Sequence, residues 1–232
     1  MSHPTTNLTS LSVCTGSPPE SEGKSAVRDH RKDSPGRVAR RSAKIMYIRM
    51  LQKFLVALFF VSSLPQFHLR DTQGVTHTTS DWAAHKAVLL YFVTVDCPVG
   101  NSYVPEMNRL REAYAARGIA FYAVQADPSV AETDVARYAR DYRYSFPLLL
   151  DPAQTLVRHA NATVTPQVAV LSPEGKVLYL GPVDNRVEDF GKQRPQATQS
   201  YVRQVLDAVL SGKAIEVASH KSIGCAIPRK TP

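Results

Sequence analysis

Continuous apolar runs alternate with amphipathic stretches through the C-terminal two-thirds of the chain. Residues 87–94, 119–126 and 147–150 are uninterrupted apolar runs, which is typical of strands covered on both faces. Residues 101–117 and 130–142 carry apolar side chains at helical spacing, which predicts helices with one buried stripe. The first part of this region is therefore expected to alternate strand and helix.

The pattern changes to a hairpin further along the chain. Apolar runs at 164–171 and 176–180 flank Ser-Pro-Glu-Gly, a composition typical of a turn. A short helix is expected at 155–160 and an amphipathic helix at 201–210. The order β-α-β-α-β-α-β-β-α predicts an α/β domain with helices on both sides of a mixed sheet.

Composition divides the chain into five segments. Residues 1–45 are rich in Ser, Thr, Pro and charge and are predicted to be disordered. Residues 46–70 start with basic side chains and continue into an uncharged apolar run at 54–64, shorter than the roughly 17–25 residues that span a bilayer as a helix. They predict a signal peptide or short membrane anchor, and so an exported, periplasmic or extracytoplasmic protein, either cleaved or tethered through residues 50–64. We expect a linker over 71–80, a folded domain over 81–212 and a C-terminal tail over 213–232.

Charge excludes one class of partner. The formal net charge is +8, but residues 1–70 hold all except about one of the excess positive charges. A nucleic-acid site needs a basic face on the folded surface. No nucleic-acid partner is therefore predicted.

Three cysteines, Cys14, Cys97 and Cys225, are the candidates for chemistry. An odd number of cysteines at wide spacing is not a disulfide framework, and the sequence has no C-x-x-C pair that would predict a metal site. It also has no phosphate-binding loop, so no organic cofactor is predicted. Cys97 follows a buried strand and opens a helix, whose N-terminus favours thiolate over thiol, whereas the carboxylate of Asp96 acts in the opposite direction. Thiolate is the nucleophile in disulfide exchange.

The motifs around Cys97 resemble the thioredoxin superfamily. Cys97-Pro98 lies at a strand-to-helix junction, Pro105 follows in the same helix, and Thr165-Pro166 opens the next hairpin. The resemblance implies a thioredoxin-like fold, with a central mixed sheet flanked by helices and a strand-helix insertion. It also implies that Thr165-Pro166 is a cis-proline loop that faces the sulfur and, with Pro98, positions substrate.

A narrower resemblance is to redoxins of the alkyl-hydroperoxide-reductase and thiol-specific-antioxidant type. Segments 97–108, 146–151, 181–186 and 223–227 look like an exported bacterial family with a single Cys-Pro motif and a C-terminal Gly-Cys-x-Ile motif. This resemblance implies a thiol-dependent oxidoreductase that acts on disulfides or peroxides.

Several positions depart from the better known patterns. Gly100 stands where a thioredoxin C-x-x-C motif has its second cysteine. Thr94 matches the peroxiredoxin signature P-x-x-x-(T/S)-x-x-C, but Leu90 replaces its proline. The peroxiredoxin mechanism also needs an arginine beside the thiolate, for which Arg186, two residues after Asp184, is the candidate.

Cys225 is the candidate second thiol. Our hypothesis is that the tail folds back and Cys225 resolves an intermediate on Cys97. A permanent disulfide and an unpaired buried thiol are the alternatives. Glu106, on the helix that follows Cys97, is a candidate proton relay, or an ordinary solvated helix residue.

Three functions stay open at this point. The first is an exported thiol-dependent oxidoreductase with Cys97 as nucleophile, a protein disulfide or peroxide as substrate and an external thiol as reductant. The second is a peroxiredoxin-like peroxidase. The third is a binding or structural module that keeps the fold without catalysis.

Overall fold

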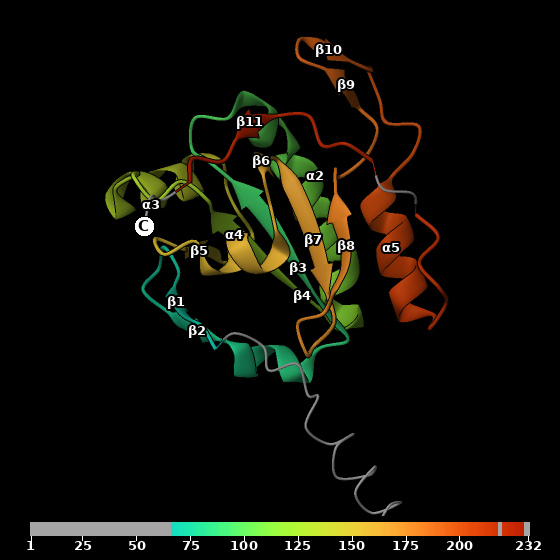
Figure 1. The fold of residues 1–232 in the computed structure, drawn as a ribbon, viewed down its shortest axis with the longest axis horizontal. Coiled ribbons are helices and arrows are strands. Elements are labelled where there is room, and N and C mark those ends of the chain that lie inside the picture. The colour runs from blue at the N-terminus through green and yellow to red at the C-terminus, as the bar shows by residue number, and fades with distance from the viewer. Residues whose placement is uncertain (1–65, 218–219, 230–232) are drawn as a thin grey trace, which may run out of the picture. The chain divides into compact units, whose positions relative to one another are not determined.

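The computed structural model describes residues 66–217 and 220–229 (Figure 1). The predicted disordered extension, residues 1–45, lies outside these residues, and so does the apolar run predicted as leader or membrane tether, residues 50–64. In the part of the chain that is described, no helix has the length and apolar character needed to cross a membrane.

A five-stranded mixed sheet with the order β5-β4-β3-β7-β8 forms the centre of the domain. Strands β3, β4 and β5 run parallel, whereas β7 is antiparallel to β3 and β8 is antiparallel to β7. Every residue of β3 and β4 is buried, as their continuous apolar runs predict. The strands span Ala87–Val93 (β3), Ile119–Gln125 (β4), Leu148–Leu150 (β5), Gln167–Leu171 (β7) and Val177–Gly181 (β8).

Helices cover both faces of this sheet. Leu89 of β3 belongs to a core cluster that includes apolar side chains of α2, α3 and α5. Its neighbour Leu90 faces the other way, into a second cluster with α4 and Trp82. The predicted α/β class with a central mixed sheet is confirmed. The helices span Pro98–Tyr114 (α2), Glu132–Asp141 (α3), Thr155–Ala160 (α4) and Tyr201–Leu210 (α5), with 3₁₀ turns at Thr79–Ala84 (η1) and Ala115–Arg117 (η2).

The folded domain begins earlier than the sequence predicts. Strands β1 (His68–Arg70) and β2 (Thr76–Thr78) form an antiparallel hairpin. Phe67 is buried and packs on Trp82, with ring centroids 5.1 Å apart. The residues that the sequence assigns to the end of the leader (66–70) and to a linker (71–80) therefore form part of the described fold. The apolar side chains of this segment are few, but they complete the second core cluster.

The predicted strand over 164–171 is divided into two strands, and the C-terminal tail pairs with the first of them. The Thr165–Pro166 peptide bond is cis and separates β6 (Val164–Thr165) from β7. Strand β11 (Cys225–Ala226) pairs antiparallel with β6. Figure 1 shows β11 at the end of the sheet from which the hairpin of β9 (Val187–Asp189) and β10 (Lys192–Gln193) also projects.

Candidate active site

Cys97 is the N-cap residue of α2. Its backbone N–H donates to the carbonyl oxygen of Thr94 at 3.2 Å, which turns the chain from β3 into the helix. Its sulfur accepts a hydrogen bond from the Gly100 N–H at 3.4 Å. Pro98 occupies the first helical position and is exposed, where its missing N–H costs nothing. Cys97 itself is fully buried.

The cis-proline loop lies directly against this sulfur. The Cys97 thiol donates to the carbonyl oxygen of Thr165 at 3.0 Å, and Thr165 is fully buried. The hydroxyl oxygens of Thr94 and Thr165 are 3.2 Å apart. The structure therefore brings together Thr94, Cys97, Thr165 and Pro166, and the predicted cis bond is confirmed.

The tail places Cys225 beside Cys97. Cys225 stands opposite Thr165 in the β11–β6 pairing, and the carbonyl oxygen of Thr165 is the group that accepts from the Cys97 thiol. The two thiols are free and not joined by a disulfide. The tail thus folds back onto the active-site end of the sheet. Its resolving role is a chemical step and stays a prediction.

Gly224, the glycine of the C-terminal Gly-Cys-x-Ile motif, permits this approach. A Cβ atom at this position would lie 1.9 Å from the carbonyl oxygen of Thr165, far inside van der Waals contact. Only a residue without a side chain lets the tail lie flat on β6. Its position directly before Cys225 is the signal in the sequence.

Residues after Cys225 anchor the tail. Ile227 is 5% exposed and packs in the second core cluster, and its N–H donates to Thr163 O at 3.0 Å. Gln154 Nε2 donates to the carbonyl oxygen of Pro228 at 2.6 Å, and Arg229 donates to Ala162 O at 2.8 Å. Burial of an isoleucine side chain contributes about 2 kcal/mol, so the C-terminal side of β11 is firmly held.

The environment separates the pKa values of the two thiols. Burial acts to raise the pKa of Cys97, but hydrogen bonds from the Cys225 thiol, the Thr165 side chain and the N–H groups of Gly100 and Cys225 outweigh it, so the pKa is lowered. Burial, the hydrogen bond to Cys97 and the charges of Cys97 and Asp96 raise the pKa of Cys225 to about 12. Cys97 is therefore the thiol that ionises, as its position before the helix predicts.

Two predicted supporting residues lie elsewhere. Glu106 accepts hydrogen bonds from Arg109 and Arg203, both at 2.8 Å. Arg186 stacks on the ring of Tyr103, 4.0 Å from its centroid, and donates to Ser102. Neither has a hydrogen bond to a sulfur among the described residues, so the structure gives no support to a proton relay through Glu106 or to thiolate stabilisation by Arg186. Both line a pocket of about 390 Å³ with Asp184.

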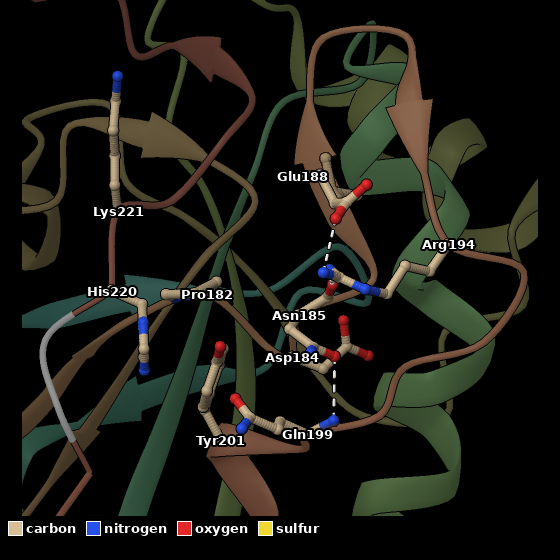
Figure 2. Close-up of a pocket in the computed structure, with 10 residues that line it drawn as sticks. Pro182, Asp184, Asn185, Glu188, Arg194, Gln199, Tyr201, His220 and Lys221 are labelled. Atoms are coloured by element: carbon tan, nitrogen blue, oxygen red, sulfur yellow. Dashed lines mark hydrogen bonds and ion pairs between the residues drawn. The ribbon is translucent and has the colours of Figure 1, made fainter.

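A larger pocket of about 490 Å³ lies between the β9–β10 segment, the start of α5 and the tail. Figure 2 shows Glu188 and Arg194 facing each other across an ion pair of 2.5 Å, with His220 and Lys221 on the tail side. Its lining is polar, and neither thiol belongs to it. Within residues 66–217 and 220–229, no group of three His, Cys, Asp or Glu side chains is placed to hold a metal ion.

Comparison with known proteins places this site in a family context. Residues 62–180 match the AhpC/TSA family. The thiol-disulfide oxidoreductase ResA of Bacillus thuringiensis subsp. konkukian is 24% identical over 143 residues, which are 61% of this chain and 75% of that protein. The match to the family includes Cys97 and Pro166 and ends before the tail that carries Cys225.

Two solved structures share the fold. A hypothetical protein of Sinorhizobium meliloti 1021 is 26% identical with a TM-score of 0.60, over 70% of this chain and 90% of that one. An uncharacterised conserved protein of Geobacillus kaustophilus is 24% identical with a TM-score of 0.62, over 74% of this chain and 92% of that one. Neither description assigns an activity.

Proposed function

The chain belongs to the AhpC/TSA family, and from that premise we propose that it is a thiol–disulfide oxidoreductase whose redox pair is Cys97 and Cys225. The observation that carries the proposal is the placement of Cys225 opposite Thr165 in the β6–β11 pairing, where the Thr165 carbonyl oxygen also accepts the hydrogen bond of the Cys97 thiol. Gly100 leaves the C-x-x-C motif without its second thiol, and the tail supplies one from a distant part of the sequence.

The cycle begins at Cys97. Its thiolate attacks one sulfur of a small disulfide, and a mixed disulfide forms on Cys97 while the second sulfur leaves as a thiolate and takes a proton. The Cys225 sulfur then loses its proton and attacks the Cys97 sulfur. This step releases the remaining half of the substrate as a thiol and forms the Cys97–Cys225 disulfide. An external thiol reductant returns the pair to two thiols.

A peroxidase is the second candidate, and the burial of Cys97 favours it. A hydroperoxide is small enough to approach a sulfur that the tail covers. The Cys97 thiolate would displace an alcohol or water and become a sulfenic acid, which Cys225 would convert to the same disulfide with loss of water. Against it stands the position of Arg186, which binds Ser102 instead of the Cys97 sulfur.

Two assays on the wild type and three variants test the proposal. Reduction of hydroxyethyl disulfide and consumption of hydrogen peroxide are measured with dithiothreitol for the wild type, Cys97→Ser and Cys225→Ser, with Cys14→Ser as the matched control. We expect Cys97→Ser to lose disulfide reduction, Cys225→Ser to accumulate a mixed disulfide on Cys97, and the control to keep wild-type rates. Peroxide consumption without disulfide reduction would favour the peroxidase. If the wild type is as inert as Cys97→Ser in both assays, only a non-catalytic module is left.

Export is also part of the proposal, and its support is the sequence of residues 46–64, a basic start followed by an apolar run. An extracytoplasmic compartment would suit a protein that handles disulfides. Fusion of residues 46–80 to a reporter enzyme that is active only outside the cytoplasm tests it. An active fusion is expected, with substitution of two apolar residues of the run by lysine as the inactive control, and an inactive unmodified fusion would contradict export.

A further inference from the structure

A pocket beside α2 gathers three arginines that the proposed redox chemistry does not use. Its volume is about 390 Å³, and its walls come from α2, from the segment after β8 and from the start of α5. We call it the arginine pocket. Three guanidinium groups and two carboxylates make up its charged lining, which therefore has a net charge of +1. These side chains belong to Glu106, Arg109, Asp184, Arg186 and Arg203.

The two carboxylates of this lining are already bonded to protein groups. Glu106 accepts from Arg109 at one oxygen and from Arg203 at the other, both at 2.8 Å. Asp184 is buried, and its Oδ1 accepts from the hydroxyl of Tyr103 at 2.6 Å. The negative charges of the pocket are thus compensated within the protein, and the excess charge is positive.

Arg186 is the guanidinium that has no carboxylate partner among the described residues. Its Nη2 donates to the carbonyl and hydroxyl oxygens of Ser102, and its plane lies 4.0 Å from the ring centroid of Tyr103. Its Nε is buried without a hydrogen-bond partner in the described part of the chain. An unpaired buried donor costs stability. A carboxylate is the acceptor that matches the planar fork of a guanidinium.

The first turn of α5 adds positive potential to the same pocket. Ser200 lines the pocket and is the N-cap residue of this ten-residue helix, but its side chain caps no backbone N–H. No acidic residue occupies the first turn. The N-terminus of a helix favours negative charge, so the helix and the arginines act in the same direction.

We propose that the arginine pocket binds one carboxylate group, carried by a small organic acid or by an acidic polypeptide. A single negative charge balances the net charge of +1, whereas a dianion would be repelled by Glu106 and Asp184. Ser102 lies five residues after Cys97 on α2, about 8 Å along the helix axis, so the ligand is held on the active-site helix. The inference does not depend on the proposed Cys97–Cys225 pair.

Titrations followed by NMR chemical shifts test the inference. The first pair of probes is N-acetylglycine and its neutral amide, and the second is acetyl-Gly-Glu-Gly-amide and its glutamine counterpart. We expect each carboxylate probe to bind and each neutral probe not to bind. Arg186→Gln and Arg203→Gln should each weaken binding about tenfold or more. Arg137→Gln is the matched control, because it removes an exposed arginine that pairs with Asp134 on α3, and it should leave the affinity unchanged.

Glu106→Gln distinguishes a change in binding from a change in folding. Removal of this negative charge releases Arg109 and Arg203 from their ion pairs, so the affinity for the carboxylate probes should rise severalfold. A misfolded variant cannot produce such a gain. An unchanged or lower affinity in Glu106→Gln would contradict the inference.

The remaining outcomes identify the ligand or overturn the site. Tighter binding of the peptide points to a polypeptide as the source of the carboxylate, tighter binding of N-acetylglycine points to a free organic acid, and either result supports the site. Equal binding of charged and neutral probes, or equal losses in Arg137→Gln and Arg186→Gln, would overturn it. Inorganic phosphate that binds as tightly as N-acetylglycine would overturn the assignment to a single carboxylate. None of these measurements involves a thiol, so the redox proposal is tested separately.

Discussion

At the scale of single residues, the site depends on one sulfur that the sequence identifies and one that it does not place. The position of Cys97 follows from its local sequence, because a buried strand ends and a helix begins around it. The partnership with Cys225 depends on the register of two-residue strands at opposite ends of the domain. No periodicity encodes such short strands, so the tail thiol was a hypothesis until the structure placed it.

Removal of the Cys225 thiol should raise the pKa of Cys97. Burial opposes ionisation of Cys97, and the hydrogen bond from Cys225 is the largest of the contributions that lower the pKa. In Cys225→Ala the thiolate should therefore appear at higher pH than in the wild type, and less of it should be present at pH 7. Titration of the thiolate by its ultraviolet absorbance measures the shift.

With Cys14 replaced by serine in every protein, Cys97→Ala is the control for that titration, because it removes the Cys97 transition and leaves only Cys225, whose pKa is raised to about 12. An unchanged Cys97 transition in Cys225→Ala would show that the tail thiol does not stabilise the thiolate. The Cys97–Cys225 contact would then have no part in activating the nucleophile.

Gly224→Ala should detach the tail from β6. The added methyl group would collide with the Thr165 carbonyl, and overpacking of this kind costs about 1–3 kcal/mol. When an oxidant is added, we expect the variant to form the Cys97–Cys225 disulfide at least ten times more slowly than the wild type. The rate is measured by mass spectrometry after alkylation. Gly191→Ala is the control, since no atom lies within 4 Å of its added Cβ. Its φ of +73° is positive, unlike that of Gly224, so a normal rate in Gly191→Ala would show that backbone strain alone does not slow the reaction. Equal rates in wild type and Gly224→Ala would contradict the close approach.

At the scale of elements, apolar periodicity identified the long strands and helices and missed the short ones. Strands β3 and β4 and helix α5 lie where the pattern predicts them. Hairpin β1–β2 has few apolar residues, and it is stabilised instead by Asp71, whose carboxylate accepts from the N–H groups of Gln73 and Val75 and from the His77 ring. A buried carboxylate that organises a turn has no apolar signature, which explains why residues 71–80 were predicted to be a linker.

Asp71→Asn should destabilise the domain. Burial acts to raise the pKa of Asp71, but hydrogen bonds from His77, Gln73 and Val75 outweigh it and hold the pKa below its ordinary value. A lowered carboxyl pKa contributes stability above the unfolded-state pKa, and this contribution disappears as pH falls through the folded-state value. The variant should lose about 1–3 kcal/mol at pH 7, and its difference from wild type should shrink below pH 4, measured by urea denaturation.

The exposed side chain of Glu112 provides the matched control, because Glu112→Gln removes a carboxylate that no described contact uses. Its stability should stay within about 0.5 kcal/mol of wild type. Equal stability of Asp71→Asn and Glu112→Gln at pH 7 would mean that hairpin β1–β2 does not contribute to the folded domain.

At the scale of the whole molecule, the redox pair joins the first active-site helix to the last strand. The Cys97–Cys225 disulfide would close a loop that contains α2, α3, α4, α5 and most of the sheet. In the chain-entropy account a loop of this length stabilises the folded state by about 4–5 kcal/mol. Family membership rests on residues 62–180, so this cross-link ties the shared part of the fold to a tail outside the matched region.

Oxidation should therefore raise the free energy of unfolding by up to about 4–5 kcal/mol. Folding and oxidation form a closed thermodynamic cycle, so the free energy by which the disulfide stabilises the fold equals the free energy by which the fold stabilises the disulfide. The hydrogen bonds that stabilise the Cys97 thiolate act in the opposite direction and favour the reduced pair. The measured gain reports the first of these opposing effects. Urea denaturation with and without dithiothreitol tests it, with Cys225→Ser as the control that should show no dependence on redox state. A wild type that is equally stable in both states would show that the tail is not covalently joined to Cys97.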